Sequence, residues 1–214
     1  MSFEGGECPE WSDKISKDRI EAFQKLVQLC VTRIEDSLRH RMPSDGDFCD
    51  LHRTLFADFV PVDYYAGNFR HDAEVGGMSC LRENVHVAGI QGRDFRLVEQ
   101  QMADLCVKAE QWSRSLRFSQ PDTALRFATF AAYYVGEFIR IHPFLNGNGR
   151  TSRLLWWWLC RRMCVTPQAR IFPRPDSDEY AVCMSECMRG NDSLLAYTIL
   201  KRLSQAGEVP LRPR

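Results

Sequence analysis

A histidine, a glycine-rich turn and two arginines stand within twelve residues of one another, in His142-Pro143-Phe144-Leu145-Asn146-Gly147-Asn148-Gly149-Arg150-Thr151-Ser152-Arg153. An unperturbed histidine titrates near about 6.5, so a neutral imidazole is available near pH 7 to take a proton from a hydroxyl group. His142 is therefore the candidate general base.

The residues after this histidine indicate a site for phosphate. The turn Gly147-Asn148-Gly149 can present its backbone N–H groups to an anion without obstruction by side chains. It leads into a predicted helix N-terminus, where unpaired N–H groups and the helix dipole attract anions. Arg150 and Arg153 are three residues apart, so both project from one face of the first turn, and each guanidinium can grip phosphate oxygens with two donors.

Two apolar helices are expected to position this segment. The first follows a start signal at Ser119-Gln120-Pro121-Asp122 and ends at the histidine. Its apolar positions recur at helical spacing and are Leu125, Ala128, Ala132, Val135 and Ile139. The second helix runs from Asn148 to Met163 and contains three consecutive tryptophans, of which at least one is expected outside the core.

The rest of the chain also has mainly helical periodicity. A long amphipathic helix is predicted over Asp13–Arg39, with the apolar stripe Ile20, Phe23, Leu26, Val27, Cys30, Ile34 and Leu38. Further helices are predicted over Asp47–Phe59, Arg96–Leu116 and Asp192–Ser204, and one after the capping-box pattern at 176–179. Residues 60–95 are rich in glycine and predict an irregular insertion with a short hairpin near Asn84–Val87. The fold class is all-α.

Composition restricts the classes of protein. The 214 residues are 44% hydrophobic and 26% charged, which is ordinary for a soluble domain. Lys plus Arg and Asp plus Glu both number 28, so the zero net charge favours no nucleic-acid partner. The apolar run Leu154–Cys160 is too short to span a membrane, and the N-terminus lacks the pattern of a secretory signal. We expect a cytoplasmic protein, with delivery into a host as an effector left open.

Nine cysteines are scattered along the chain without the layout of a disulfide scaffold. They are expected to be free, mostly buried thiols in a reducing compartment. Cys160 with Cys164 and Cys183 with Cys187 are spaced four apart, which would suit a zinc clamp. The same spacing is that of core positions on a helix, and this second interpretation is preferred.

The segment from His142 to Arg153 resembles the Fic-family signature His-x-Phe-x-(Asp/Glu)-Gly-Asn-Gly-Arg-x-x-Arg at every defined position except Asn146. Leu51–Phe56 and Ala66-Gly67-Asn68-Phe69-Arg70 are similar to the family's upstream helix and its Ala-Gly-x-x-Arg turn. The resemblance covers roughly residues 48–203. It implies a Fic-type helical bundle with a short β-hairpin flap, organised as an N-terminal helix packed on the core (1–45), a Fic domain (46–205) and a C-terminal tail (206–214).

The resemblance also implies an activity. Fic proteins of this pattern are protein adenylyltransferases, which transfer AMP from ATP to a Ser, Thr or Tyr hydroxyl of a target protein. His142 would be the base and Phe144 would anchor the loop. Gly147, Asn148 and Gly149 would form an anion hole, and Arg150 and Arg153 would bind the outer phosphates. In the family a hairpin flap, here within Asn84–Leu97, pairs with the target's backbone, which makes Ile90 and Phe95 candidate contacts to the target.

Asn146 stands where most members of the family carry a carboxylate that holds Mg²⁺. An amide oxygen can coordinate the ion but lacks the negative charge that Mg²⁺ favours. The substitution leaves open a slower transferase, an enzyme whose metal is held mainly by ATP, or a nucleotide binder with little chemistry.

Restraint of the enzyme is a separate question. The segment Ser79-Cys80-Leu81-Arg82-Glu83-Asn84 matches the family's inhibitory pattern, (Ser/Thr)-x-x-x-Glu-(Gly/Asn), but lies in the irregular insertion. Glu83 is therefore a candidate brake, beside the alternatives of an unregulated enzyme or one restrained by an antitoxin chain.

Two further functions stay open. One is transfer of another phosphate-linked group, such as UMP or phosphocholine, from the same site. The other is a catalytically weak nucleotide-binding or interaction module, motivated by Asn146. The expected partner is a target protein, neither a nucleic acid nor a membrane. A homodimer through an exposed tryptophan of Trp156–Trp158 is a further possibility, and the role as toxin, housekeeping enzyme or effector is open.

Overall fold

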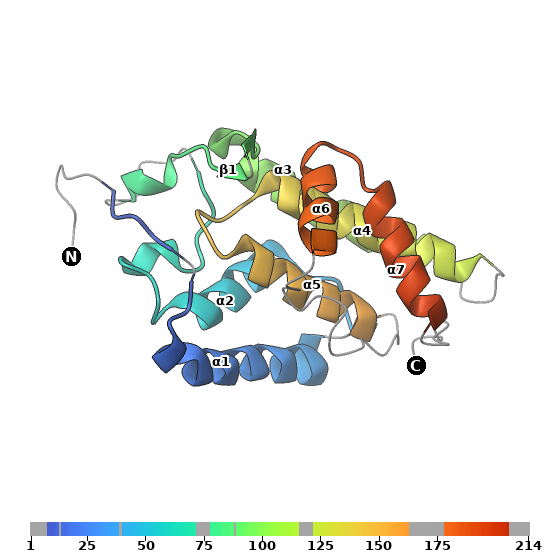
Figure 1. Ribbon diagram of the computed structural model, residues 1–214, viewed down its shortest axis with the longest axis horizontal. Coiled ribbons are helices and arrows are strands. Elements are labelled where there is room, and N and C mark those ends of the chain that lie inside the picture. Colours follow the sequence, from blue (N-terminus) through green and yellow to red (C-terminus); the bar gives the residue numbers. More distant parts are fainter. Residues whose placement is uncertain are drawn as a thin grey trace.

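Helices make up most of the structure. The computed structural model describes residues 8–12, 14–38, 40–71, 78–87, 89–115, 122–162 and 178–205. These residues form seven α-helices and one two-stranded hairpin (Figure 1), which confirms the all-α prediction with a short hairpin. The helices are α1 (Ile20–Arg33), α2 (Asp45–Phe56), α3 (Val98–Ser115), α4 (Thr123–Ile141), α5 (Asn148–Arg162), α6 (Asp178–Met188) and α7 (Ser193–Gln205). The strands are β1 (His86–Val87) and β2 (Ile90–Gln91).

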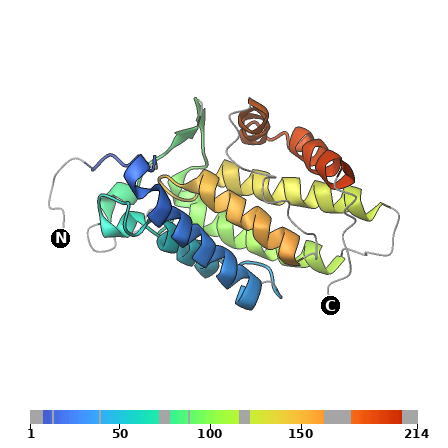
Figure 2. The ribbon, with the colours of Figure 1, turned by 60° about the horizontal axis from the view of Figure 1, so that its bottom comes forward.

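Helix α4 is the centre of the bundle and contacts α3, α5, α6 and α7 (Figures 1 and 2). Neighbours on several sides explain why thirteen of its nineteen residues are buried and why its sequence is so apolar. Leu125 is an exception to the predicted apolar stripe, because its side chain is 53% exposed. It lies in the first turns of α4, which extend past the neighbouring helices (Figure 1).

Helix α1 packs along α2 and α5 and forms a second core cluster with them. The predicted N-terminal helix is divided into a 3-10 turn at Lys17–Arg19, α1, and a wider π-helical turn at Ile34–Leu38. Phe23, Cys30 and Ile34 of the predicted stripe are buried. Ile20 was assigned wrongly to that stripe: it is the first residue of α1, lies outside the contact with α2 and α5, and is 42% exposed.

The predicted helix boundaries differ little from the observed ones. α5 begins at Asn148 as predicted, and its last described residue is Arg162. α2 begins two residues before the predicted Asp47, because the Asp47 carboxylate accepts hydrogen bonds from the backbone N–H and hydroxyl of Ser44 and caps the helix there. α3 is preceded by a 3-10 turn at Phe95–Leu97. The start signal at 119–121, the capping pattern at 176–177 and the tail from 206 onwards lie outside the described residues.

The free-thiol prediction is wrong for one pair of cysteines, since Cys8 and Cys80 form a disulfide across 72 residues of sequence. Cys160, Cys183 and Cys187 lie buried in the core around α4, as the core interpretation of their spacing requires. Cys164 lies outside the described residues. In the described part of the chain, no group of three or more His, Cys, Asp or Glu side chains is placed to hold a metal ion.

The hairpin, the loop between α4 and α5, and the N-terminal residues 8–12 gather at one end of the bundle (Figures 1 and 2). The backbone N–H of Arg93, just after β2, donates to the carbonyl of Arg140 in the last turn of α4 and joins the hairpin to that helix. None of the described helices is both long enough and apolar enough to cross a membrane.

Candidate active site

His142 terminates α4 in a left-handed backbone conformation, with φ 51° and ψ 60°. It is the one non-glycine residue with positive φ among those described. Such a conformation costs of order 1–3 kcal/mol and persists only where the surroundings impose it. Its N–H donates to the carbonyl of Phe138 at 3.0 Å, which closes the helix at this point.

Arg70 holds the backbone of His142 in this conformation. Its buried guanidinium donates to four backbone carbonyls at 2.8–2.9 Å, those of Ile141, His142, Glu83 and Arg93. Burial lowers the pKa of Arg70 to about 10, so the group stays charged near neutral pH. Two of the carbonyls belong to the end of α4 and two flank the hairpin, and Arg70 therefore fixes the hairpin relative to His142.

The imidazole of His142 is held in a form suited to a base. Its Nδ1 lies 3.3 Å from the carbonyl oxygen of Ile139. An Nδ1–H that donates to this carbonyl leaves the lone pair on Nε2. Burial lowers the pKa of His142 to about 4, and the nearby positive charge of Arg70 acts in the same direction. The side chain is therefore neutral near pH 7.

Phe144 belongs to the loop between α4 and α5, and its side chain is fully buried. Its ring stacks on the imidazole of His52, with centroids 3.7 Å apart, and contacts Phe69 at 5.1 Å. The N–H of Gly67 donates to Nδ1 of His52 at 2.9 Å, so the proton of this imidazole is on Nε2, which donates to the carbonyl of Asn146 at 3.0 Å. The anchoring position predicted for Phe144 is thus shared with His52, a residue of the upstream helix to which the sequence assigned no role.

The turn at Gly147 requires glycine for two reasons. Its φ is 77°, and an added Cβ would lie 2.5 Å from the ring of Phe56 and 3.0 Å from Nε2 of His52. The close packing brings the chain directly into the first turn of α5. Helix geometry leaves the first N–H groups of α5, those of Asn148 and Gly149, without acceptors inside the helix.

The side chain of Asn148 stabilises the loop through hydrogen bonds to its backbone. Its Oδ1 accepts from the N–H of Phe144 at 3.0 Å, and its Nδ2 donates to the carbonyl of the same residue at 2.8 Å. The residue is 1% exposed. Both polar atoms of the amide thus bind the backbone of Phe144, and what Asn148 can offer to an anion at the start of α5 is its backbone N–H.

The two arginines of the motif have different surroundings. The guanidinium carbon of Arg150 lies 5.3 Å from the ring centroid of Phe23, and so this side chain rests against α1. Arg153 is partly exposed and has no ion-pair partner among the described residues. Of the pair, Arg153 is the one whose charge no ion pair among the described residues neutralises.

The residues present do not fit a magnesium site held by the protein. Nδ2 of Asn146 donates to the carbonyl of Trp11 at 2.9 Å, and Oδ1 accepts from the N–H of Gly147 at 2.8 Å. The amide therefore already holds two backbone groups and carries no charge. Mg²⁺ favours carboxylate ligands, and the described residues supply no cluster of them here.

The predicted flap is a short antiparallel hairpin in which His86 pairs with Gln91 and Val87 with Ile90. Ile90 lies in β2, but its side chain is partly buried and packs against the main core. Phe95 lies beyond the hairpin, in the 3-10 turn, where its N–H donates to Oδ1 of Asn84 at 3.0 Å. As contacts to a target, both residues stay predictions.

Glu83 lies at the base of the hairpin, with an exposed side chain. Arg70 binds its backbone carbonyl, not its carboxylate. Within the described residues the carboxylate makes no ion pair with Arg153, the contact that a brake would need. Its inhibitory role also stays a prediction.

The helical bundle, with a histidine at the end of one helix and a glycine turn into the next, defines a protein of the Fic type. The sequence profile of the Fic/DOC family matches residues 43–160, more than half of the chain. The chain therefore belongs to this family, which confirms the resemblance seen in the sequence.

Relatives and solved structures agree with this assignment. Protein adenylyltransferase Fic of Drosophila persimilis is 30% identical over 155 residues, which are 67% of this chain and 30% of that protein. The chain thus spans about 30% of the length of this relative. BepC, a VirB-translocated effector of Bartonella tribocorum solved with AMPPNP, is 18% identical with a TM-score of 0.58, and the match covers 94% of each chain. The N-terminal Fic domain of a Bep effector from Bartonella quintana, solved with ADP, is 18% identical with a TM-score of 0.57, over 94% of this chain and 92% of that one.

Proposed function

We propose that this chain is a protein adenylyltransferase that transfers AMP from ATP to a Ser, Thr or Tyr hydroxyl of a target protein. The observation that carries the proposal is the neutral imidazole of His142, whose backbone Arg70 holds at the start of the loop that leads into α5. A base and an anion-binding helix end thus meet in one loop. The adenylyltransferase name of the relative from Drosophila persimilis supports the same reaction.

The nucleotide binds with its phosphates at the start of α5. The backbone N–H groups of Asn148 and Gly149 and the charge of Arg153 provide donors there, and Arg150 adds a second positive charge. The AMPPNP in the BepC structure and the ADP in the Bartonella quintana structure support a nucleotide as the ligand. A magnesium ion that accompanies ATP would be held by the phosphates.

In the reaction, Nε2 of His142 accepts the proton of the target hydroxyl. The hydroxyl oxygen forms a bond to the α-phosphorus of ATP, the bond between that phosphorus and the bridging oxygen breaks, and pyrophosphate leaves. The target segment is positioned by the hairpin, to whose edge an extended chain can be added as a further strand.

The test is transfer from labelled nucleotides by the purified chain. ATP labelled at the α-phosphate, UTP labelled in the same way and labelled CDP-choline are each incubated with the chain and with candidate acceptor proteins. We expect label from ATP in protein, its loss in His142→Ala, and its retention in His40→Ala, a control histidine on the surface. If label is transferred only from UTP or CDP-choline, the transferred group is UMP or phosphocholine and not AMP.

A second candidate function is a nucleotide-binding module without transfer. It is favoured by the side chain of Asn146, which is uncharged and already bound to Trp11 and Gly147. ATP binding without label transfer to any acceptor would select this candidate over the transferase.

A further inference from the structure

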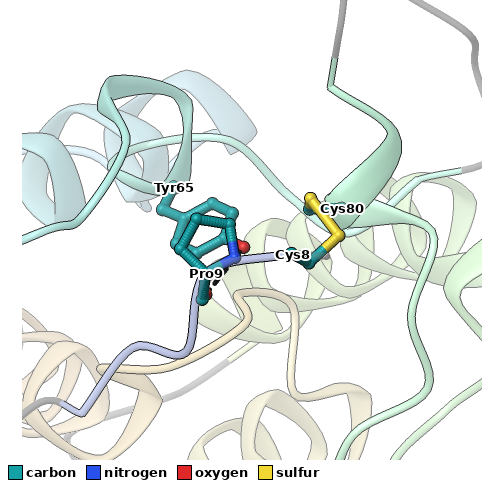
Figure 3. The surroundings of a disulfide bond; sticks show 4 residues. All are labelled: Cys8, Pro9, Tyr65 and Cys80. Carbon is teal, nitrogen blue, oxygen red and sulfur yellow. Dashed lines mark hydrogen bonds between the residues drawn. A yellow bond between two sulfur atoms is a disulfide. The ribbon is translucent and has the colours of Figure 1, made fainter. Parts of the chain in front are cut away.

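Residues 8–12, here called the strap, are fastened at three points to the end of the bundle that carries the candidate site. Cys8 is joined to Cys80 by the disulfide, and the carbonyl of Pro9 accepts a hydrogen bond from the hydroxyl of Tyr65 at 3.0 Å (Figure 3). The third fastening is the hydrogen bond from Nδ2 of Asn146 to the carbonyl of Trp11. The strap therefore binds directly to the catalytic loop.

The ring of Trp11 packs into an aromatic cluster behind the loop. Its centroid lies 5.4 Å from that of Phe56, 5.8 Å from that of His52 and 6.2 Å from that of Tyr65. Its indole Nε1 is buried but has no hydrogen-bond partner among the described residues, and a buried donor left unpaired opposes burial. The aromatic contacts hold the strap in place, but less firmly than they would if the indole N–H also had a hydrogen-bond acceptor.

A cavity of about 530 Å³ lies between the strap, the base of the hairpin and the loop between α4 and α5. The strap forms one wall, Glu83 and Val85 at the base of the hairpin form another, and Leu145 and Asn146 of the loop form a third. As long as the strap is fastened, a ligand can reach Leu145 and Asn146 from this side only through the cavity.

The identity of residue 146 agrees with this arrangement. The amide of Asn146 has an N–H to donate to the carbonyl of Trp11, whereas a carboxylate at the same place would set two acceptors against each other. The residue that departs from the family's carboxylate is thus one of the three residues that bind the strap.

We propose that the strap is a redox-released cover of the Asn146 side of the candidate site, fastened when Cys8 and Cys80 are joined and free to leave when they are reduced. That its release changes nucleotide binding rests on the proposed function. Disulfides persist in oxidising compartments and are lost where thiols are kept reduced, so the surroundings of the protein would set the state of the strap.

The release step is an ordinary thiol–disulfide exchange with a dithiol. Cys8 is exposed and Cys80 is buried, so a thiolate of the reductant attacks the sulfur of Cys8. The bond between the two cysteine sulfurs breaks, and Cys80 leaves as a thiolate that takes up a proton. The second thiol of the reductant then attacks the mixed disulfide and releases Cys8 as a thiol. The protein gains two electrons and two protons, and the reductant leaves as a cyclic disulfide.

The experiment compares the full chain in oxidised form, the same chain reduced by dithiothreitol, and the Cys8→Ser and Cys80→Ser variants. Cys106→Ser is the matched control, because it removes a free thiol whose hydrogen bond to Asp45 a serine can also make. Peptide mapping after alkylation reports whether Cys8 and Cys80 are joined. Tryptic cleavage after Lys14, next to the strap, reports its release, and calorimetric titration reports ATP affinity.

We expect reduction and both cysteine variants to speed cleavage after Lys14 by about fivefold or more, since cleavage follows the population of the opened segment. We expect Asn146→Asp to speed it further in the Cys8→Ser background. The apparent Kd for ATP should fall by about threefold or more when the strap is released, because the fraction of competent protein rises. Cys106→Ser should behave as the parent chain does.

Three results would overturn the proposal: Cys8 and Cys80 both alkylated in the oxidised protein, cleavage after Lys14 that does not depend on redox state, or ATP affinity that is equal in both states. If ATP binds to neither state, the proposed function fails, whereas the cleavage assay still decides whether the strap is released. The failures of the two proposals are therefore distinguishable.

Discussion

The imidazole of His52 lies flat against the ring of Phe144, with the centroids 3.7 Å apart and the planes inclined by 13°. The two residues are 92 positions apart in the chain, on α2 and on the loop that follows α4. The same imidazole accepts from Gly67 and donates to Asn146. One buried histidine thus joins the upstream helix, the turn at Gly67 and the loop that carries His142, and it does so only in its neutral form.

The first prediction concerns the stability of this neutral histidine. Burial lowers the pKa of His52 to about 3, whereas a histidine in the unfolded chain titrates near about 6.5. Between these values the unfolded state binds the extra proton, so stability falls as the pH falls. For His52 alone the loss is about 1.5 kcal/mol between pH 6.5 and pH 5. Urea unfolding at several pH values measures it.

The control is His52→Gln, which retains a donor and an acceptor but does not titrate. We expect the variant to be less stable than the parent at pH 7 and to lose less stability between pH 6.5 and pH 5. Equal pH slopes for the two proteins would show that the protonation of His52 does not contribute.

The second prediction concerns Gly147, where backbone and packing both exclude a side chain. Gly147→Ala would need a positive φ of 77° and would place Cβ 2.5 Å from Phe56. We expect a loss of about 2 kcal/mol or more in the free energy of unfolding, from backbone strain together with overpacking. Gly46→Ala is the control, because Gly46 stands in helix α2 and, apart from its chain neighbours and the helix backbone, no atom of the described residues lies within 4 Å of its added Cβ. It should be neutral or stabilise the protein by up to about 1 kcal/mol. Similar losses in both variants would contradict this account.

The third prediction concerns Arg70 as the link between the hairpin and α4. Arg70→Gln leaves several of the four buried carbonyls without a donor, at an expected cost of at least about 3 kcal/mol. Hydrogen exchange should also become faster at the backbone N–H groups of Gly92 and Arg93, which close the hairpin and join it to α4.

Two further variants keep this test decisive. Arg70→Lys retains the charge and part of the donors, so its free energy of unfolding should lie between those of the parent and of Arg70→Gln. If the glutamine variant does not fold, the exchange experiment is made with Arg70→Lys. Arg189→Gln removes an exposed arginine from the turn after α6 and should change stability by less than about 0.5 kcal/mol. Exchange at Gly92 and Arg93 that is unchanged in Arg70→Lys would show that Arg70 does not hold the hairpin.

The sequence predicted the parts of this site that follow from local pattern. The glycine turn and the start of α5 at Asn148 could be placed because helix start signals and periodicity are local. The stack of His52 on Phe144 and the bond of Cys8 to Cys80 could not, because periodicity shows which face of a helix is buried but not which distant residue meets it. The sequence also could not show that Asn148, the first residue of α5, directs its amide to the backbone of Phe144, because this contact forms only when the loop is closed.

The last prediction concerns the pH dependence of transfer. Because burial and Arg70 lower the pKa of His142 to about 4, the base form is lost only as the pH falls through that value. With saturating ATP, the rate of AMP incorporation should therefore change by less than about a fifth between pH 8 and pH 6. A histidine with the usual pKa would lose about fourfold over the same interval. Circular dichroism at each pH, together with the stability of His52→Gln, shows whether a fall in rate comes from protonation of His142 or from acid unfolding. A fourfold fall in rate with the fold intact would show that His142 titrates normally and that its burial does not set the protonation of the base.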